Sequence, residues 1–269
     1  IPPPDKHLGN VLEAFPVTHL SLVATQLHRL LKGNLPNIRA RQRLAAVLVG
    51  GGPTGEDLIG EAYDRGFPIR TTYGLTEMAS QVTTTGPNEN RPALSTSGKV
   101  LDYRQVKIDD GEILVKGATL FRGYVADDGL VLPVDESGWF RTGDLGKMDA
   151  EGYLSLLGRK DNMFISGGEN IYAEEVEASI ERLSSVVQAV VVPVKNVEFG
   201  FRPVAFVRFR DGQTVAHDEL MRHLEKELPG FKIPDAFFDW PEAADGGLKP
   251  DRQFLAALAR KRFGTEPVD

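Results

Sequence analysis

Apolar and polar positions alternate along the first ninety residues in a pattern that predicts strand, helix, strand, helix and strand. The expected strands are short apolar or β-branched runs, and the expected helices carry apolar side chains at helical spacing. This order is typical of α/β architecture with a parallel sheet. We therefore expect residues 1–90 to form part of an α/β subdomain. The elements, in chain order, are residues 18–24, 25–32, 43–50, 55–66 and 67–73.

The pattern changes near residue 98 to short apolar runs separated by glycine-containing turns. Such spacing is typical of a small barrel or a curled antiparallel sheet. We expect residues 91–160 to form a small β-barrel subdomain. The predicted strands are residues 103–109, 111–117, 121–125, 129–134, 138–149 and 152–159.

After residue 160 helices and strands follow in a mixed order. Residues 173–183 and 217–228 repeat apolar side chains at helical spacing, and between them residues 186–194 and 202–209 read as strands. A last helix is expected at 251–263. Residues 161–269 therefore predict a compact α+β domain.

Composition narrows the classes of partner. The chain has 269 residues, 41% of them apolar, with 31 basic against 38 acidic side chains and a net charge of −7. The absence of a basic stripe excludes nucleic acid as an expected partner. There is no cysteine, so any thiol chemistry has to come from a cofactor. No apolar stretch is long enough to cross a membrane, so we expect a soluble cytoplasmic protein that binds no membrane.

A glycine-rich turn lies between a predicted strand and a predicted helix. Gly50, Gly52 and Gly55 match G-x-G-x-x-G, but the acid that a dinucleotide fold needs about 20 residues later is missing, and Glu56 stands where a phosphate-binding loop needs lysine. The turn is then either an ordinary entry into a helix or a place where a planar base lies against bare backbone.

Two further segments carry candidate chemistry. The segment TYGLTE places Tyr73 near the end of a strand, where ligands bind in open α/β sheets, although Thr76 could equally cap a short helix that has Glu77 in its first turn. The segment from 138 to 177 is dense in glycine, aspartate and arginine. Within it lie Asp144, Arg159, Asp161, Gly167 and Gly168.

Together these segments resemble the adenylate-forming superfamily of acyl-CoA synthetases, luciferases and peptide-synthetase adenylation domains. The segment YGLTE looks like the family's Y-G-x-T-E, and GWFRTGDLG looks like its Y-R-T-G-D segment. GRKDNMFISGGENIYAEEVE resembles the G-R-x-D to E-V-E stretch, and GGLKPDR keeps the Lys and Arg of G-K-x-x-R at Lys249 and Arg252. Within the superfamily, four segments look most like the o-succinylbenzoate-CoA ligases of menaquinone biosynthesis: THLSLVATQLHRLL, YGLTEMASQVTTT, SGGENIYAEEVE and PVKNVEFGFRPVAFV.

The resemblance implies ATP, Mg²⁺ and coenzyme A as cofactors or substrates, and a small carboxylic acid as the second substrate. It implies that Glu77 helps to hold Mg²⁺ on the ATP phosphates, that Thr76 bonds phosphate, and that Lys249 carries adenylation. It also implies that the C-terminal domain is mobile and rotates about Asp161, and that Gly167 and Gly168 line the tunnel for CoA. The implied nucleotide-binding residues are Gly50, Gly51, Gly52, Tyr73, Gly74, Asp144 and Arg159.

One family motif is missing. The Ser/Thr/Gly-rich phosphate loop should precede these segments and is not in this sequence. We therefore expect the chain to be the C-terminal portion of an enzyme and to be inactive alone. Two alternatives remain open: a ligase for another fatty or aryl acid, and a non-catalytic nucleotide-binding module. A homodimer is also compatible with the sequence.

Overall fold

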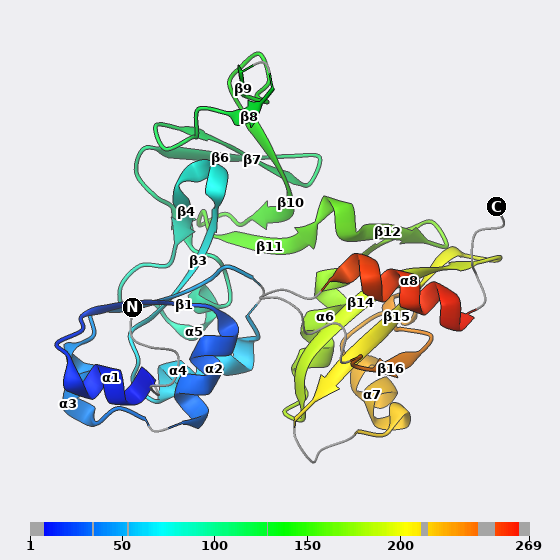
Figure 1. Cartoon of the computed structure of the whole chain (residues 1–269), viewed down its shortest axis with the longest axis horizontal. Coiled ribbons are helices and arrows are strands. Elements are labelled where there is room, and N and C mark those ends of the chain that lie inside the picture. The colour runs from blue at the N-terminus through cyan, green and yellow to red at the C-terminus, as the bar shows by residue number, and fades with distance from the viewer. Residues whose placement is uncertain are drawn as a thin grey trace. The chain divides into compact units, whose positions relative to one another are not determined.

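A computed structural model describes residues 8–33, 35–52, 54–127, 129–210, 215–241 and 251–263. The chain divides into two compact units, residues 1–156 and residues 157–269. Figure 1 labels the helices and strands. Among the described residues, no helix combines the length and the apolar character needed to cross a membrane.

The first half of unit 1 is built on a mixed five-stranded sheet in the order β1-β2-β3-β4-β5. The first three strands pair in parallel, as the alternating pattern predicted, and β4 and β5 continue the sheet antiparallel. Leucine, valine and isoleucine side chains from β1, β2 and β3 and from the neighbouring helices form one core. The elements are α1 (Leu8–Ala14), β1 (His19–Leu22), α2 (Ala24–Lys32), α3 (Ile38–Arg43), β2 (Ala46–Val49), α4 (Glu56–Asp64), β3 (Ile69–Leu75), the 3₁₀ helix η1 (Thr76–Met78), β4 (Ser80–Thr84), α5 (Arg91–Leu94) and β5 (Lys99–Val100).

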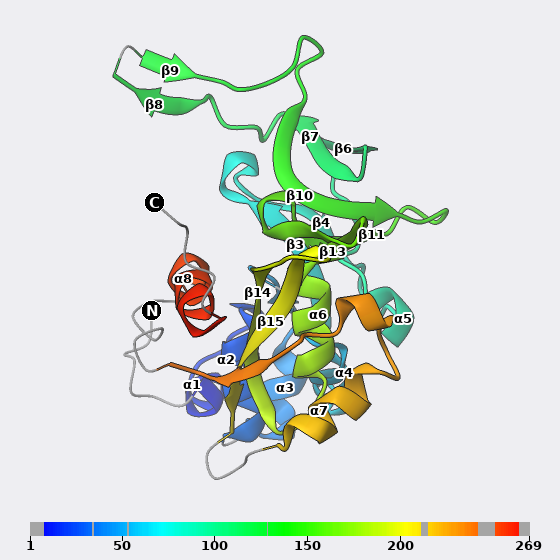
Figure 2. The same ribbon diagram turned by 90° about the vertical axis from the view of Figure 1, so that its right-hand side faces the viewer.

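The second half of unit 1 holds a four-stranded sheet in the order β11-β10-β7-β6. Strands β6 and β7, and β7 and β10, pair antiparallel. A separate hairpin of β8 and β9 extends away from this sheet (Figure 2). The antiparallel pairing agrees with the sequence pattern, whereas closure into a barrel stays a prediction. The strands are β6 (Arg104–Asp109), β7 (Glu112–Gly117), β8 (Tyr124–Ala126), β9 (Gly129–Val131), β10 (Phe140–Met148) and β11 (Leu154–Arg159), the last of which runs into unit 2.

Unit 2 is an α+β sandwich around a sheet in the order β13-β12-β15-β14, with β16 added beside β15. Alternate residues of β14 face opposite sides: Ala189 and Val191 join the core under α6 and α7, while Val190 and Val192 join the core under α8. Figure 2 shows α8 on one face of the sheet and α6 and α7 on the other. The elements are η2 (Lys160–Asn162), β12 (Met163–Ser166), β13 (Glu169–Tyr172), α6 (Ala173–Glu181), β14 (Val186–Asn196), β15 (Gly200–Phe209), α7 (His217–Leu224), η3 (Gly230–Lys232), β16 (Phe237–Asp239) and α8 (Arg252–Phe263).

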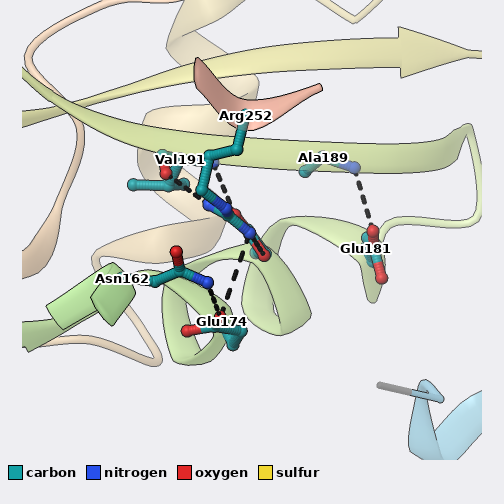
Figure 3. A network of polar contacts seen from close by, with 7 residues as sticks. Asn162, Glu174, Glu181, Ala189, Val191 and Arg252 are labelled. Carbon is teal, nitrogen blue, oxygen red and sulfur yellow. Dashed lines mark hydrogen bonds and ion pairs between the residues drawn. The ribbon is translucent and has the colours of Figure 1, made fainter. Parts of the chain in front are cut away.

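Carboxylates of helix α6 occupy the outer edge of strand β14, which is the last strand in the sheet order. The backbone N–H of Ala189 donates to Glu181 Oε1 at 2.9 Å, and that of Val191 donates to Glu177 Oε1 at 2.7 Å. An edge strand otherwise leaves such donors without a partner, which is costly when they are buried. The two carboxylates, one helical turn apart, therefore accept the hydrogen bonds that a neighbouring strand would otherwise accept (Figure 3).

The Glu181 carboxyl makes stability depend on pH. Its burial raises its pKa from 4.5 to about 7, the Glu177 charge acts in the same direction, and the Ala189 N–H acts against both. Because this pKa is raised in the folded state, the folded protein binds the extra proton between these two values. The contribution of this group to stability is therefore fully present below the lower value and is lost as the pH rises through about 7.

We expect Glu181→Gln to increase the free energy of unfolding by about 1 to 3 kcal/mol more near pH 8 than near pH 5. Glutamine keeps an acceptor for the Ala189 N–H and removes the charge that burial disfavours. Urea unfolding at the two pH values measures the difference, with the exposed Glu225→Gln as the control. An equal gain at both pH values would contradict the assigned proton.

Candidate functional site

Two of the predicted nucleotide-binding residues meet in unit 1. The hydroxyl of Tyr73, near the end of β3, donates to Asp144 Oδ2 of β10 at 2.6 Å, although 71 residues separate them in the chain. Tyr73 is 6% exposed and lies in the core that links the two sheets of the unit. The Asp144 N–H donates to Thr142 Oγ1 at 3.0 Å, and that hydroxyl donates to the Ile113 carbonyl at 2.7 Å. Thr142 thus holds the backbone of Asp144, and the buried phenol of Tyr73 holds its carboxylate.

Gly74 is required by the neighbouring strand. A Cβ placed on it would lie 2.0 Å from the Ser80 carbonyl oxygen, and the β3–β4 register shifts between Tyr73 and Gly74. The resemblance implies that this glycine contributes to a nucleotide site. In the structure the group that approaches Gly74 closely is the backbone of the paired strand β4 at Ser80.

Thr76 and Glu77 lie in η1, directly after β3. Thr76 begins the helix; the N-cap is Leu75, without a side-chain capping bond, so the capping role considered for Thr76 is wrong. Glu77 Oε1 accepts a hydrogen bond of 2.6 Å from the Tyr124 hydroxyl. Directly after β3, the short helix therefore carries a hydroxyl and a carboxylate on two consecutive residues.

Tyr124 contacts the predicted site residue Glu77, and the sequence analysis missed it. It lies in the exposed β8–β9 hairpin, and its hydrogen bond to Glu77 raises its pKa above the ordinary value. A single aromatic residue in an exposed strand carries no sequence motif or spacing that would identify it as part of a site. A hollow of about 580 Å³ adjoins Tyr124, Trp139 and Arg141 and has none of the predicted site residues in its lining.

The glycine-rich turn follows β2. A Cβ on Gly50 would lie 2.7 Å from Thr72 Cγ2 and 2.8 Å from the Thr72 carbonyl oxygen, so the neighbouring strand β3 requires glycine there. Gly51 has a positive φ of 81°, whereas Gly52 is exposed, and a Cβ added to it would have no atom within 4 Å. Gly50 is thus explained by the approach of β3 and Gly51 by its positive φ, and of the three glycines Gly52 alone has no atom within 4 Å of an added Cβ.

Arg159 and Asp161 lie in unit 2, at the end of β11 and in η2. Arg159 Nη2 and Asp161 Oδ2 are 3.3 Å apart, and both side chains are exposed. Exposed ion pairs of this kind contribute about 0 to 1 kcal/mol to stability, so the Arg159 guanidinium can leave Asp161 at little cost in free energy. Because Asp144 belongs to unit 1, the predicted grouping of Asp144 with Arg159 stays a prediction.

Gly167 and Gly168 form the turn of the β12–β13 hairpin. Ser166 pairs with Glu169 across it, and both glycines have positive φ, 59° and 89°. Such a pair is the usual sequence of a two-residue hairpin turn. They are thus turn glycines, but the turn joins two strands and does not open a helix, because α6 begins only at Ala173. Both are exposed, and the Gly167 N–H donates to the Phe199 carbonyl at 2.9 Å.

Lys249 lies outside the described residues. Its motif partner Arg252 is the first residue of α8 and bonds Glu177 and the Val191 carbonyl. Burial disfavours the Arg252 charge, but the hydrogen bonds and charge of Glu177 outweigh it and raise its pKa. Burial also disfavours the charge of Glu177 and so raises the pKa of its carboxyl, although Arg252 acts in the opposite direction.

Comparison with known proteins identifies relatives for both units. The family model described as AMP-binding enzyme matches residues 1–125, and that described as AMP-binding enzyme C-terminal domain matches residues 175–242. A 2-succinylbenzoate–CoA ligase of Listeria monocytogenes is 37% identical over 235 residues, which cover 86% of this chain and 49% of the relative. The chain spans about half the length of the curated relatives it matches.

Two solved structures of o-succinylbenzoate CoA synthetase (MenE) from Bacillus subtilis are similar in fold. The complex with the acyl-adenylate intermediate OSB-AMP is 33% identical, with a TM-score of 0.80 over 91% of this chain and 52% of that one. The complex with ATP and a magnesium ion is also 33% identical, with a TM-score of 0.75 over 86% of this chain and 49% of that one.

Proposed function

Because the chain belongs to the AMP-binding enzyme family, we propose that the complete protein, meaning the natural polypeptide that contains it, is an ATP-dependent acid–CoA ligase. The similarity to 2-succinylbenzoate–CoA ligases supports 2-succinylbenzoate as the acid. The observation that carries the proposal is the Tyr73–Asp144 hydrogen bond, which joins two of the family's motif segments at one point.

The proposed reaction has two steps. A carboxylate oxygen of the acid attacks the α-phosphorus of ATP, and pyrophosphate leaves, so that an acyl-adenylate forms. The thiol of CoA then attacks the acyl carbonyl, loses its proton, and displaces AMP. In the first step two anions meet, so the residues that neutralise charge govern the rate.

In unit 1 the proposed nucleotide site combines Tyr73, Asp144 and Gly52. The Asp144 carboxylate accepts a hydrogen bond from Tyr73, and the Asp144 backbone N–H is held by Thr142, so the carboxylate is suited to accept hydrogen bonds from the two ribose hydroxyls. The exposed backbone of Gly52 is suited to lie against a flat base. Gly50, Gly51 and Gly74 shape the backbone around that site.

Glu77 is the proposed contact to magnesium. Among the described residues there is no cluster of three or more His, Cys, Asp or Glu side chains suited to a metal ion. Mg²⁺ often uses only one or two carboxylates together with substrate phosphates, so the single carboxylate of Glu77 fits it. The ion would supply charge neutralisation on the phosphates, while Tyr124 orients the carboxylate and Thr76 offers a hydroxyl to the phosphate.

In unit 2 we assign Lys249 to the adenylation step and Arg159 to the ribose. Gly167 and Gly168 would border the path of the CoA thiol, where an exposed hairpin turn without side chains leaves room. Asp161 would be the hinge about which the C-terminal domain alternates between the two steps. The division into an α/β subdomain, a small barrel and a C-terminal domain belongs to the same proposal.

The test is acid-dependent exchange of pyrophosphate into ATP by the complete protein over a panel of acids. We expect exchange with 2-succinylbenzoate and formation of its CoA thioester and AMP once CoA is added. Exchange with fatty or aryl acids but not with 2-succinylbenzoate would identify a different ligase. Nucleotide binding without exchange on any acid would identify a non-catalytic module.

A further inference from the structure

Two sequence motifs of the C-terminal unit are joined by one partly buried ion pair between residues that lie 75 positions apart. Arg252 Nη1 donates to Glu177 Oε1 at 2.6 Å, and Arg252 Nη2 donates to Glu177 Oε2 at 3.1 Å. Arg252 Nη1 also donates to the Val191 carbonyl at 2.7 Å. Both oxygens of the carboxylate are therefore engaged by a planar fork, the geometry that fixes direction as well as distance.

The pair ties the start of helix α8 to helix α6. Arg252 is the first residue of α8, and Asp251 directly before it accepts the Phe254 N–H through Oδ1 at 3.0 Å. The rest of α8 packs on the opposite face of the sheet from α6, through Leu255 and Ala259. The Arg252 side chain reaches Glu177 of α6 at the edge of strand β14, so it links the first turn of α8 to α6 across that edge.

The same helix α6 also holds the segment next to the predicted hinge. Asn162, which follows Asp161, donates to Glu174 Oε1 at 2.5 Å, and that oxygen lies 4.0 Å from Arg252 Nη2 (Figure 3). A Cβ on Gly158 would lie 2.4 Å from Glu174 Oε2, so the strand before the hinge packs closely on the same side chain.

We propose that Glu177 and Arg252 are positioning residues for the adenylation step, because together they anchor the chain three residues after Lys249 to the helix that also anchors the hinge segment. The proposal rests on the proposed function. A flexible lysine gains most from such an anchor, since a reacting ammonium has to be held within a narrow range of positions. Glu174 and Asn162 extend the anchor to the hinge segment.

A role confined to folding would predict a different result. A buried ion pair that only stabilises the domain affects both half-reactions alike, through the amount of folded protein. A pair that positions Lys249 affects the step that uses Lys249 and spares the attack of the thiol on a ready-made adenylate. The two half-reactions therefore separate the roles.

The experiment uses the complete protein with Glu177→Gln and Arg252→Lys, both of which keep a hydrogen-bonding group at the site. We expect each to slow acid-dependent pyrophosphate exchange about 10-fold, while thioester formation from supplied acyl-adenylate and CoA stays within about two-fold of wild type. Arg252→Gln should lose more exchange than Arg252→Lys. Glu181→Gln, on the same helix but bonded to Ala189, should leave both half-reactions unchanged.

Thermal unfolding of each variant shows how much of it is folded, and rates are taken per folded molecule. Equal losses in the two half-reactions, or unchanged exchange in a folded variant, would overturn the positioning role. If Glu177→Gln does not fold, Arg252→Lys decides the matter alone, because it retains the cation beside Glu177. Absence of exchange in the wild type would instead refute the proposed function.

Discussion

Replacing Lys249 by alanine in the complete protein is expected to slow acyl-adenylate formation by about 10² to 10³-fold, or about 3 to 4 kcal/mol. A compact ammonium on a flexible stem can contact the attacking carboxylate and the α-phosphate together, so its contribution appears mainly in the transition state. Single-turnover measurement of pyrophosphate release gives the rate. Thioester formation from supplied adenylate should fall far less.

The matched control is Lys261→Ala, which removes an exposed lysine from helix α8 of the same domain. It should leave both half-reactions at the wild-type rate. Loss of thioester formation equal to the loss of adenylation in Lys249→Ala would show that the lysine serves the whole domain and not the first step.

Replacing Gly74 by alanine is expected to destabilise unit 1 by about 2 to 3 kcal/mol, which lowers its Tm by about 4 to 12 °C. The added methyl group would lie 2.0 Å from the Ser80 carbonyl oxygen, and backbone on a paired strand cannot move aside as a flexible side chain can. The strands must separate at this point or shift in register. Thermal unfolding followed by circular dichroism measures the change.

Gly55→Ala is the control for this substitution. Gly55 is the N-cap of helix α4, its φ is −59°, and no atom lies within 4 Å of an added Cβ. The Tm should therefore fall far less than in Gly74→Ala, by only the small cost of alanine at an N-cap. A Gly74→Ala variant as stable as wild type but with weaker ATP binding would instead favour a direct role for Gly74 as a point of approach for the nucleotide.

The sequence predicted the elements whose apolar pattern is long or regular. Strands β1, β2 and β3 and helix α4 follow from runs that local chemistry alone favours. Helix α3 has only six residues, IRARQR, with a single buried alanine, so it shows no apolar stripe. Strands β12 and β13 have four residues each and are joined by the turn at Gly167 and Gly168. The local sequence of such a glycine pair does not show whether a strand or a helix follows.

The predicted site residues were found through motifs, but their contacts depend on tertiary structure. Tyr73 and Asp144 lie 71 residues apart, and nothing in either motif indicates that the phenol donates to the carboxylate. Glu177 and Arg252 were parts of recognised segments, yet their pairing appears only once β14 lies between α6 and α8. Tyr124 had no motif, so only its contact with Glu77 reveals it.

The most direct test of the central claim is a crystal structure of the complete protein with a stable acyl-adenylate analogue. We predict that both ribose hydroxyls lie within about 2.5 to 3.0 Å of the Asp144 carboxylate, with the Tyr73 hydroxyl still donating to it. An adenosine bound elsewhere, with no contact to Asp144, would contradict the account.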